Sequence, residues 1–293
     1  MYLLPLAILP GLILLYYFYK KDHASPEPWY HIWITVILAG IFVLPAAFAE
    51  IGLSSLTGLS EVGSAINVFI YSVFVVSLVE ELCKLLAIRV FAYRKPEFDE
   101  TIDGLVYGAA SGAGFAMVEN VFYVLEHGFA VGVMRAFLSV PLHVFTGVIL
   151  GYGLIRLKLH GSYLRIVLLF VLSVVLHGVY DHVLFTMNAG SPGISFLIAV
   201  CCVVILLGFA RYYARKYQTS VEDNSPKPSV FMKFFWMIAG ILNLLASAFM
   251  ALGTYANYSE GKLDDPGIYA TLILLPLALG VFCLMRQRRY TWS

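Results

Sequence analysis

The hydrophobic positions of this chain form long uninterrupted stretches rather than the short alternating patterns of a soluble protein. An apolar helix needs about 20 residues to cross the roughly 30 Å hydrocarbon core of a bilayer, and stretches of that length recur throughout the sequence. Nine of them occupy residues 2–19, 30–50, 64–88, 102–125, 131–155, 163–187, 193–212, 231–256 and 267–285. We therefore predict an all-α fold, a polytopic integral membrane helical bundle of about nine transmembrane helices.

The amino-acid composition is that of a membrane protein. Hydrophobic residues make up 60% of the chain and charged residues 13%, and the mean hydropathy is +0.84. The net charge of only +1 gives no indication of a nucleic-acid partner, and we expect none. The predicted setting is a lipid bilayer, crossed several times.

The longest polar segment, residues 213–230, divides the chain. It contains Glu222 and Asp223 together with two prolines, which predicts an exposed cytoplasmic linker. All the ionisable clusters within apolar stretches precede it. We therefore predict a functional core with N-terminal spans at residues 1–212, and a C-terminal transmembrane hairpin and tail at residues 231–293.

Lysine and arginine residues lie almost entirely in alternate loops. Arg135 and Lys262 are assigned to the opposite loops, and Lys84 lies inside a span. The other 16 of the 19 are Lys20, Lys21, Arg89, Arg94, Lys95, Arg156, Lys158, Arg165, Arg211, Arg215, Lys216, Lys227, Lys233, Arg286, Arg288 and Arg289. Because basic loops stay in the cytoplasm, we predict that the N-terminus is outside and the C-terminus cytoplasmic.

Ionisable side chains interrupt four of the apolar stretches. A charged group at the centre of a bilayer costs roughly 2.5 to 3.5 kcal/mol on insertion scales, so a chain that places several there is expected to use them. The patterns are Glu80-Glu81-x-x-Lys84, Phe115-x-x-x-Glu119-Asn120, His143 and His177-x-x-x-Asp181. We predict that they share one polar pocket, a hydrolytic site buried in the membrane.

The charges of these side chains favour a bound cation. Four carboxylates outnumber the single lysine, and a low-dielectric site does not keep such an excess unpaired. Two histidines with two or more carboxylates suit zinc. We therefore predict one divalent metal, zinc, held by Glu81, Glu119, His143 and His177. Asp181 and Asn120 are expected to support these ligands, Asp181 by orienting His177, and Glu80 can exchange roles with Glu81.

Protonated carboxylates are the alternative to a metal. In that version Glu80 is the base that activates a water, and His177 or Lys84 stabilises the oxyanion. The ligands come from four separate helices, so sequence spacing does not decide between the two versions. The predicted catalytic set is Glu80, Glu81, Glu119, His177 and Lys84.

These motifs resemble the PrsW family of intramembrane proteases, over roughly residues 65–185. The segments that carry the resemblance are Glu80-Glu81-Leu82-Cys83-Lys84, Asp103-Gly104-Leu105-Val106-Tyr107-Gly108, Gly114-Phe115-Ala116-Met117-Val118-Glu119-Asn120, His143 and His177-Gly178-Val179-Tyr180-Asp181. The family shares a superfamily with the type II CAAX prenyl endopeptidases. The resemblance implies that Glu80 acts on the water together with Glu119, which stands where the prenyl endopeptidases have a histidine.

The resemblance also implies the substrate class, a membrane protein or a membrane-anchored peptide, which in the best-known member is an anti-sigma factor. We predict a membrane-embedded endopeptidase of metallo- or glutamic type that acts in regulated proteolysis, as a multi-pass protein of a bacterial or archaeal plasma membrane. A non-catalytic membrane scaffold or chaperone is one alternative, and a proton-coupled transporter is another, because both can contain buried Glu, His and Lys. The chain shows no internal repeat that would favour transport.

Overall fold

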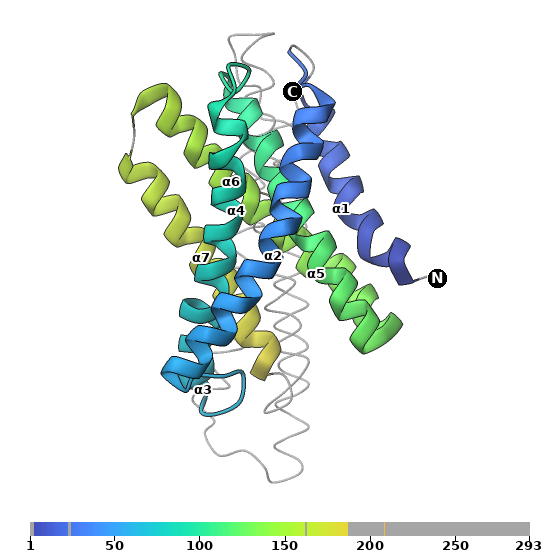
Figure 1. The fold of residues 1–293 in the computed structure, drawn as a ribbon, viewed down its shortest axis with the longest axis vertical. Helices are drawn as coiled ribbons and strands as arrows, with labels where there is room; N and C mark the ends of the chain where they lie inside the picture. Colours follow the sequence, from blue (N-terminus) through green and yellow to red (C-terminus); the bar gives the residue numbers. More distant parts are fainter. Residues whose placement is uncertain (1–2, 23–24, 162, 187–207, 209–293) are drawn as a thin grey trace, which may run out of the picture.

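The computed structural model describes residues 3–22, 25–161, 163–186 and 208, and every element in these ranges is a helix. The elements are α1 (Leu3–Tyr19), α2 (Trp29–Thr57), α3 (Ala65–Tyr71), η1 (Ser72–Ser77), α4 (Leu78–Val90), η2 (Ala92–Arg94), α5 (Thr101–Phe137), α6 (Ser139–His160) and α7 (Tyr163–Thr186). Figure 1 shows them as one bundle. The predicted all-α class is confirmed for these residues.

Four helical segments within the described ranges are long and apolar enough to cross a membrane. They are Trp29–Thr57, Ala65–Arg94, Ser139–His160 and Tyr163–Thr186. The shorter apolar helix α1 and the long α5 account for the other two of the first six predicted spans. The spans predicted at 193–212, 231–256 and 267–285 lie outside the described residues, as does the 213–230 linker. The count of nine and the division of the chain therefore stay predictions.

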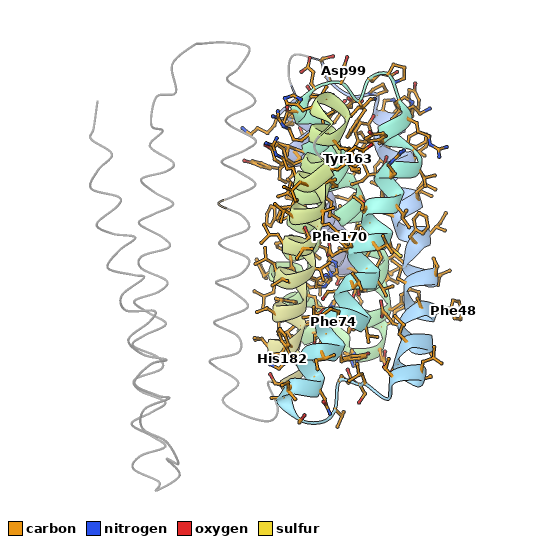
Figure 2. The ribbon with its side chains drawn as sticks, turned by 90° about the vertical axis from the view of Figure 1, so that its left-hand side faces the viewer. Phe48, Phe74, Asp99, Tyr163, Phe170 and His182 are labelled. Carbon is orange, nitrogen blue, oxygen red and sulfur yellow. The ribbon has the colours of Figure 1, made fainter. Side chains whose placement is uncertain are left out.

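Helix α5 is the centre of the bundle. It packs against α1, α2 and α6, while α7 packs against α6 and η1. From Ile102 to Met117 every residue of α5 is buried. The outer helices instead direct large apolar side chains away from the bundle, as Phe48 and Phe74 show in Figure 2. This outward apolar surface is what a helix in contact with lipid requires, because lipid does not solvate polar groups.

Glycines allow the backbones of α5 and α6 to touch. A Cβ atom at Gly108 would overlap the carbonyl oxygen of Gly147, and one at Gly112 would overlap the carbonyl oxygen of His143. Small residues at four-residue spacing permit this approach in membrane helices. The position of His143 is consequently fixed by direct backbone contact with α5.

A π-helical turn, η1, lies immediately before the two adjacent glutamates of α4. Its backbone carbonyl at Ser72 accepts a hydrogen bond of 2.7 Å from the Ser77 hydroxyl, and both serines are buried. A Cβ at Gly178 would meet Val73 and Ser77, so α7 packs directly on this turn. Single π-helical turns occur often at functional sites, and here the turn brings the glutamates of α4 beside His177.

The connections that carry basic residues meet at one end of the bundle. Lys158, near the end of α6, donates a hydrogen bond of 2.7 Å to the backbone carbonyl of Lys95. Asp99 and Tyr163 lie at this end in Figure 2, and His182 lies towards the other. This arrangement agrees with the alternation of basic loops.

Candidate active site

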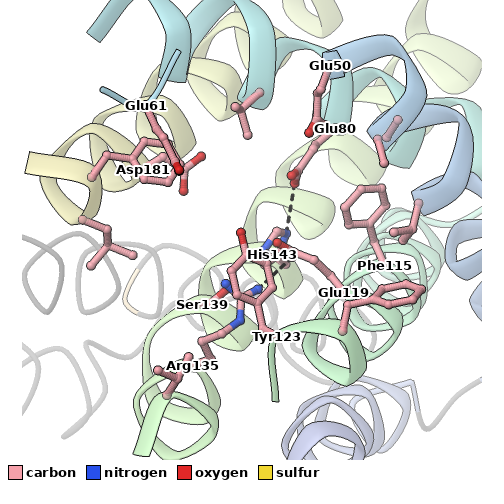
Figure 3. A pocket seen from close by; sticks show the side chains of 18 of the residues that line it. Glu50, Glu61, Glu80, Phe115, Glu119, Tyr123, Arg135, Ser139, His143 and Asp181 are labelled. Atoms are coloured by element: carbon pink, nitrogen blue, oxygen red, sulfur yellow. Dashed lines mark ion pairs between the residues drawn. The ribbon is translucent and has the colours of Figure 1, made fainter. Parts of the chain in front are cut away.

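A pocket of about 440 Å³ opens between α2, α4, α5, α6 and α7. Its polar lining comes from elements far apart in the sequence, as Figure 3 shows. The polar residues that line it are Glu50, Glu61, Tyr71, Glu80, Glu119, Tyr123, His127, Arg135, Ser139, His143 and Asp181. Five of these eleven carry carboxylates, so the pocket is strongly acidic.

Three buried side chains converge beside this pocket. One ligand atom from each of Glu80, His143 and His177 lies within 4.8 Å of the other two. Glu80 Oε2 is 3.8 Å from His143 Nδ1 and 3.7 Å from His177 Nε2. In a tetrahedral zinc site with bonds of about 2.0 to 2.1 Å, neighbouring ligand atoms lie about 3.4 Å apart. The two distances from Glu80 are slightly longer than this spacing, so the three side chains could close on one ion with a small adjustment.

The hydrogen-bonding state of these atoms supports the same interpretation. Among the described residues, Glu80 Oε2, His143 Nδ1 and Asp181 Oδ2 are buried and accept or donate no hydrogen bond. Asp181 Oδ2 lies 3.3 Å from His177 Nε2, on the same side as Glu80. Buried polar atoms without partners are rare and costly. A cation at this point would satisfy Glu80 Oε2 and His143 Nδ1, and a water beside it could satisfy Asp181 Oδ2. The donor set of imidazole and carboxylate suits zinc.

Each histidine has a carboxylate on its other ring nitrogen. His177 Nδ1 is hydrogen-bonded to Glu81 Oε1 at 2.8 Å, and His143 Nε2 lies 2.9 Å from Glu119 Oε2. A carboxylate in this place holds the N–H on its own side and leaves the opposite nitrogen free to bind a metal. The two imidazoles lie 4.9 Å apart, with their planes at 80°.

Glu81 is neutralised from behind by Lys84. The ammonium group lies 2.6 Å from Glu81 Oε1, and both side chains are fully buried. Thr146 donates a further hydrogen bond of 3.0 Å to the same oxygen. A buried carboxylate needs such partners to stay charged. Glu81 is therefore a fixed acceptor for His177, and Lys84 lies outside the set of residues that line the pocket.

Comparison with known proteins agrees with this geometry. The model of a family described as PrsW family intramembrane metalloproteases matches residues 27–209. The chain belongs to the PrsW family. It is a multi-pass membrane protein and an intramembrane protease, as the motifs predicted. No solved structure shows a significant match to the chain.

Curated bacterial relatives share the matched region. Protease PrsW of Oceanobacillus iheyensis is 34% identical over 187 residues, which cover 62% of this chain and 82% of the relative. Protease PrsW of Bacillus subtilis is 34% identical over 180 residues, with coverages of 60% and 80%. Protease PrsW of Clostridioides difficile is 33% identical over 190 residues, covering 61% and 77%.

In this PrsW-family site the residues predicted from sequence fall into two groups, one facing the centre of the site and one behind the histidines. His143 and His177 face the centre together with Glu80, whereas Glu81 and Glu119 lie on the outer nitrogens. The geometry thus favours Glu80 over Glu81 as the carboxylate that faces the metal, an alternative that the sequence left open. Asp181 lies beside the inner nitrogen of His177, where it can contact a ligand of the pocket.

Within the described part of the chain, no hydrogen bond or ion pair joins Asn120 to a histidine. Its amide oxygen accepts a hydrogen bond of 2.6 Å from Arg135 Nε. Asn120 therefore supports the site through Arg135, a residue that the charge pattern counts with a loop. Arg135 is in fact 7% exposed and lies in the second part of α5.

Sequence reasoning missed two other polar groups of the site. Glu50 lines the pocket from α2, which continues to Thr57 beyond the predicted end at residue 50. It is the only Asp, Glu, Lys or Arg in that helix, and this was a usable signal. Thr146 lies one helical turn after His143, and nothing in the sequence indicated its hydrogen bond to Glu81.

A second group of buried carboxylates lies near the end that carries the basic connections. Asp22, Glu27 and Asp103 each place an oxygen within 4.8 Å of the others. The Tyr107 hydroxyl donates a hydrogen bond of 2.6 Å to Glu27. Burial raises the pKa of Glu27, which lies between α1 and α2, to about 8. Burial thus favours the protonated form of Glu27, which reduces the negative charge of this group.

Proposed function

We propose that the chain hydrolyses peptide bonds of membrane proteins at one divalent ion, zinc, held by Glu80, His143 and His177. The observation that carries the proposal is the convergence of these three side chains on one point, with a carboxylate behind each histidine. A bound zinc ion would polarise the scissile carbonyl and lower the pKa of a water to about 7. Family membership supports metal-dependent proteolysis in general.

The chain's own residues divide the remaining work. Glu81 and Glu119 keep the two imidazoles in fixed orientations and tautomers. Asp181 Oδ2 faces the same space as the ligands and has no other hydrogen-bond partner among the described residues. We assign to it the general-base role, in which it accepts the proton of the attacking water.

The proposed substrate is a membrane protein or membrane-anchored peptide, with an anti-sigma factor as the example that the family resemblance suggests. The pocket is lined by Glu61, in the α2–α3 connection, and by His127, beside Gly128. It therefore lies towards the end of the bundle opposite Asp99 and Tyr163. With the proposed orientation in a bacterial or archaeal plasma membrane, cleavage takes place in the outer half of the bilayer.

Metal removal tests this function. Protein purified in detergent should contain one zinc ion per chain by elemental analysis and should cut a single-span substrate. A chelator should remove the ion and the cleavage together, and added zinc should restore both. If the active protein contains no stoichiometric metal and tolerates chelators, the metal-free version with Glu80 as the base replaces this one.

Cysteine labelling tests the orientation. In a protein without its native cysteines, Ser25→Cys and Ser220→Cys should react only with reagents that reach the cytoplasm. Val62→Cys, at an exposed position of the α2–α3 connection, should react with a membrane-impermeant reagent added outside. Labelling of Ser25→Cys from outside, or of Val62→Cys only from the cytoplasm, would reverse the proposed topology.

A further inference from the structure

Helix α5 changes direction at Gly128. This glycine has φ 80° and ψ −163°, a conformation outside the helical region that is essentially restricted to glycine. Arg135 nevertheless donates a hydrogen bond to Asn120, 15 residues earlier in the same element. In a straight helix these positions would be separated by about 22 Å. The segment after Gly128 must therefore run back along the segment before it.

The returning segment is packed closely enough to need a second glycine. A Cβ at Gly132 would lie 2.7 Å from Leu6 of α1 and 2.9 Å from Val124 of α5. The reversal is thus held between two helices and does not project freely. Its last turn places Arg135 in the wall of the pocket.

Arg135 contacts three side chains from one stretch of α5. Its Nη2 lies 2.9 Å from Glu119 Oε2, and its Nε donates to Asn120 at 2.6 Å. Its guanidinium carbon lies 3.7 Å from the centre of the Tyr123 ring. A planar guanidinium can make these contacts together, which the point charge of a lysine cannot.

The contact with Glu119 connects Arg135 to the candidate metal site. The same Glu119 oxygen lies 2.9 Å from His143 Nε2, and His143 Nδ1 faces Glu80. Among the described residues that line the pocket, Arg135 carries the only permanent positive charge, against five carboxylates. It therefore stabilises Glu119 in the position and charge state in which that carboxylate supports His143.

We propose that Arg135 is a positioning residue of the active site, brought by the reversal at Gly128 to fix Glu119 on His143 and so to present His143 Nδ1 to the metal. The inference rests on the proposed metal-dependent function. Arg135 is assigned no contact with the ion or with the scissile bond. Its effect passes through Glu119, and this distinguishes it from a residue that only stabilises the fold.

The test uses Arg135→Gln and Arg135→Lys in the full-length protein, with Co²⁺ as a spectroscopic metal probe. Arg135→Gln should weaken Co²⁺ binding by about 10- to 100-fold, the range for groups that support metal-bound histidines. The visible spectrum of the bound Co²⁺ should change, and kcat should fall more than KM. Arg135→Lys should recover part of the affinity, because it keeps the charge but not the paired geometry.

Arg89→Gln is the matched control. Arg89 also stacks on a tyrosine, with its guanidinium carbon 4.2 Å from the centre of the Tyr93 ring, but it lies on the exposed side of α4. Its replacement should leave Co²⁺ affinity and spectrum unchanged. An Arg135→Gln protein that binds Co²⁺ with the affinity and spectrum of the wild type would overturn the inference, and so would an equal loss in Arg89→Gln.

A double-mutant cycle with Glu119→Gln separates this inference from the function on which it rests. If Arg135 acts through Glu119, Arg135→Gln should add little to the loss already caused by Glu119→Gln. Additive losses would contradict the inference. If the wild type binds no metal, the proposed function fails, and the same cycle measured on cleavage rates decides the role of Arg135. If Arg135→Gln does not accumulate, the cycle is measured with Arg135→Lys.

Discussion

Glu80→Gln is expected to reduce peptide cleavage to background while the protein still inserts into the membrane and purifies. Glu80 Oε2 faces both inner histidine nitrogens and has no hydrogen-bond partner among the described residues. A glutamine of the same size removes the negative charge that would hold the ion, but it breaks no existing hydrogen bond of that oxygen. Cleavage of a single-span substrate measures the loss, and elemental analysis should show that the ion is lost as well.

Glu97→Gln serves as the control for this experiment. Glu97 is an exposed glutamate in the connection between η2 and α5, away from the pocket. Its replacement changes the net charge by the same amount and should leave cleavage intact. Substantial cleavage by Glu80→Gln protein would remove Glu80 from the catalytic set in both the metal-dependent and the metal-free mechanism.

Glu81→Gln should also abolish cleavage, but with a different effect on the folded protein. The change leaves the fully buried Lys84 without its ion-pair partner, and breaking a buried pair on one side costs about 3 to 5 kcal/mol. The single variant should therefore accumulate poorly. The double variant Glu81→Gln with Lys84→Met removes both charges and should restore accumulation, while cleavage stays lost because His177 Nδ1 no longer faces a carboxylate. Full activity of the double variant would contradict the role given to Glu81.

The second large effect concerns His177 and Asp181, the two residues of α7 assigned to the site, which should respond differently. His177→Ala is expected to lose both the bound ion and cleavage, because the imidazole would be a direct ligand. Asp181→Asn should keep the ion and lower kcat by about 10²- to 10⁴-fold, the range for general acid–base groups. Metal content and kcat measured on the same preparations provide the comparison.

The adjacent residue His182 provides the control on the same helix. Its ring packs edge-on against Phe69, with centres 5.5 Å apart, and it is not among the residues that line the pocket. His182→Ala should retain both metal and cleavage. Loss of the ion in Asp181→Asn would make Asp181 a fourth ligand instead of the base. Retention of the ion in His177→Ala would contradict the proposed ligand set.

The helices could be predicted from sequence because their apolar length is a local property. The first six predicted spans fall on the described helices, with boundary errors where polar residues belong to the bundle interior. The largest error lies at residues 131–138, which are predicted as the start of the fifth span although α6 begins only at Ser139. The chain reverses at Gly128, inside the predicted loop, and the helical segment that follows still belongs to α5. Arg135, which the charge pattern counts with that loop, is buried in this returning segment.

The members of the site were visible in the sequence, but their places were not. Charged residues in apolar helices are conspicuous, and this identified Glu80, Glu119 and His177. Whether Glu80 or Glu81 faces the centre depends on how α4 is rotated after the π-helical turn η1. That rotation is set by the packing of α4 against α7 and α6. The spacing of residues within one helix cannot predict such packing. The pairing of Glu81 with Lys84, at a spacing of three residues, followed the local rule for helices.

The direct contact of the α5 and α6 backbones determines where substrate preference can diverge among homologous enzymes. Any side chain added at Gly108 or Gly112 would push against main-chain atoms of α6 and move His143 away from its partners. Other lining positions carry side chains from α2 and α7, among them Val43, Ala46 and Leu184. New specificities should therefore evolve at those positions, and directed evolution of this protease should begin there.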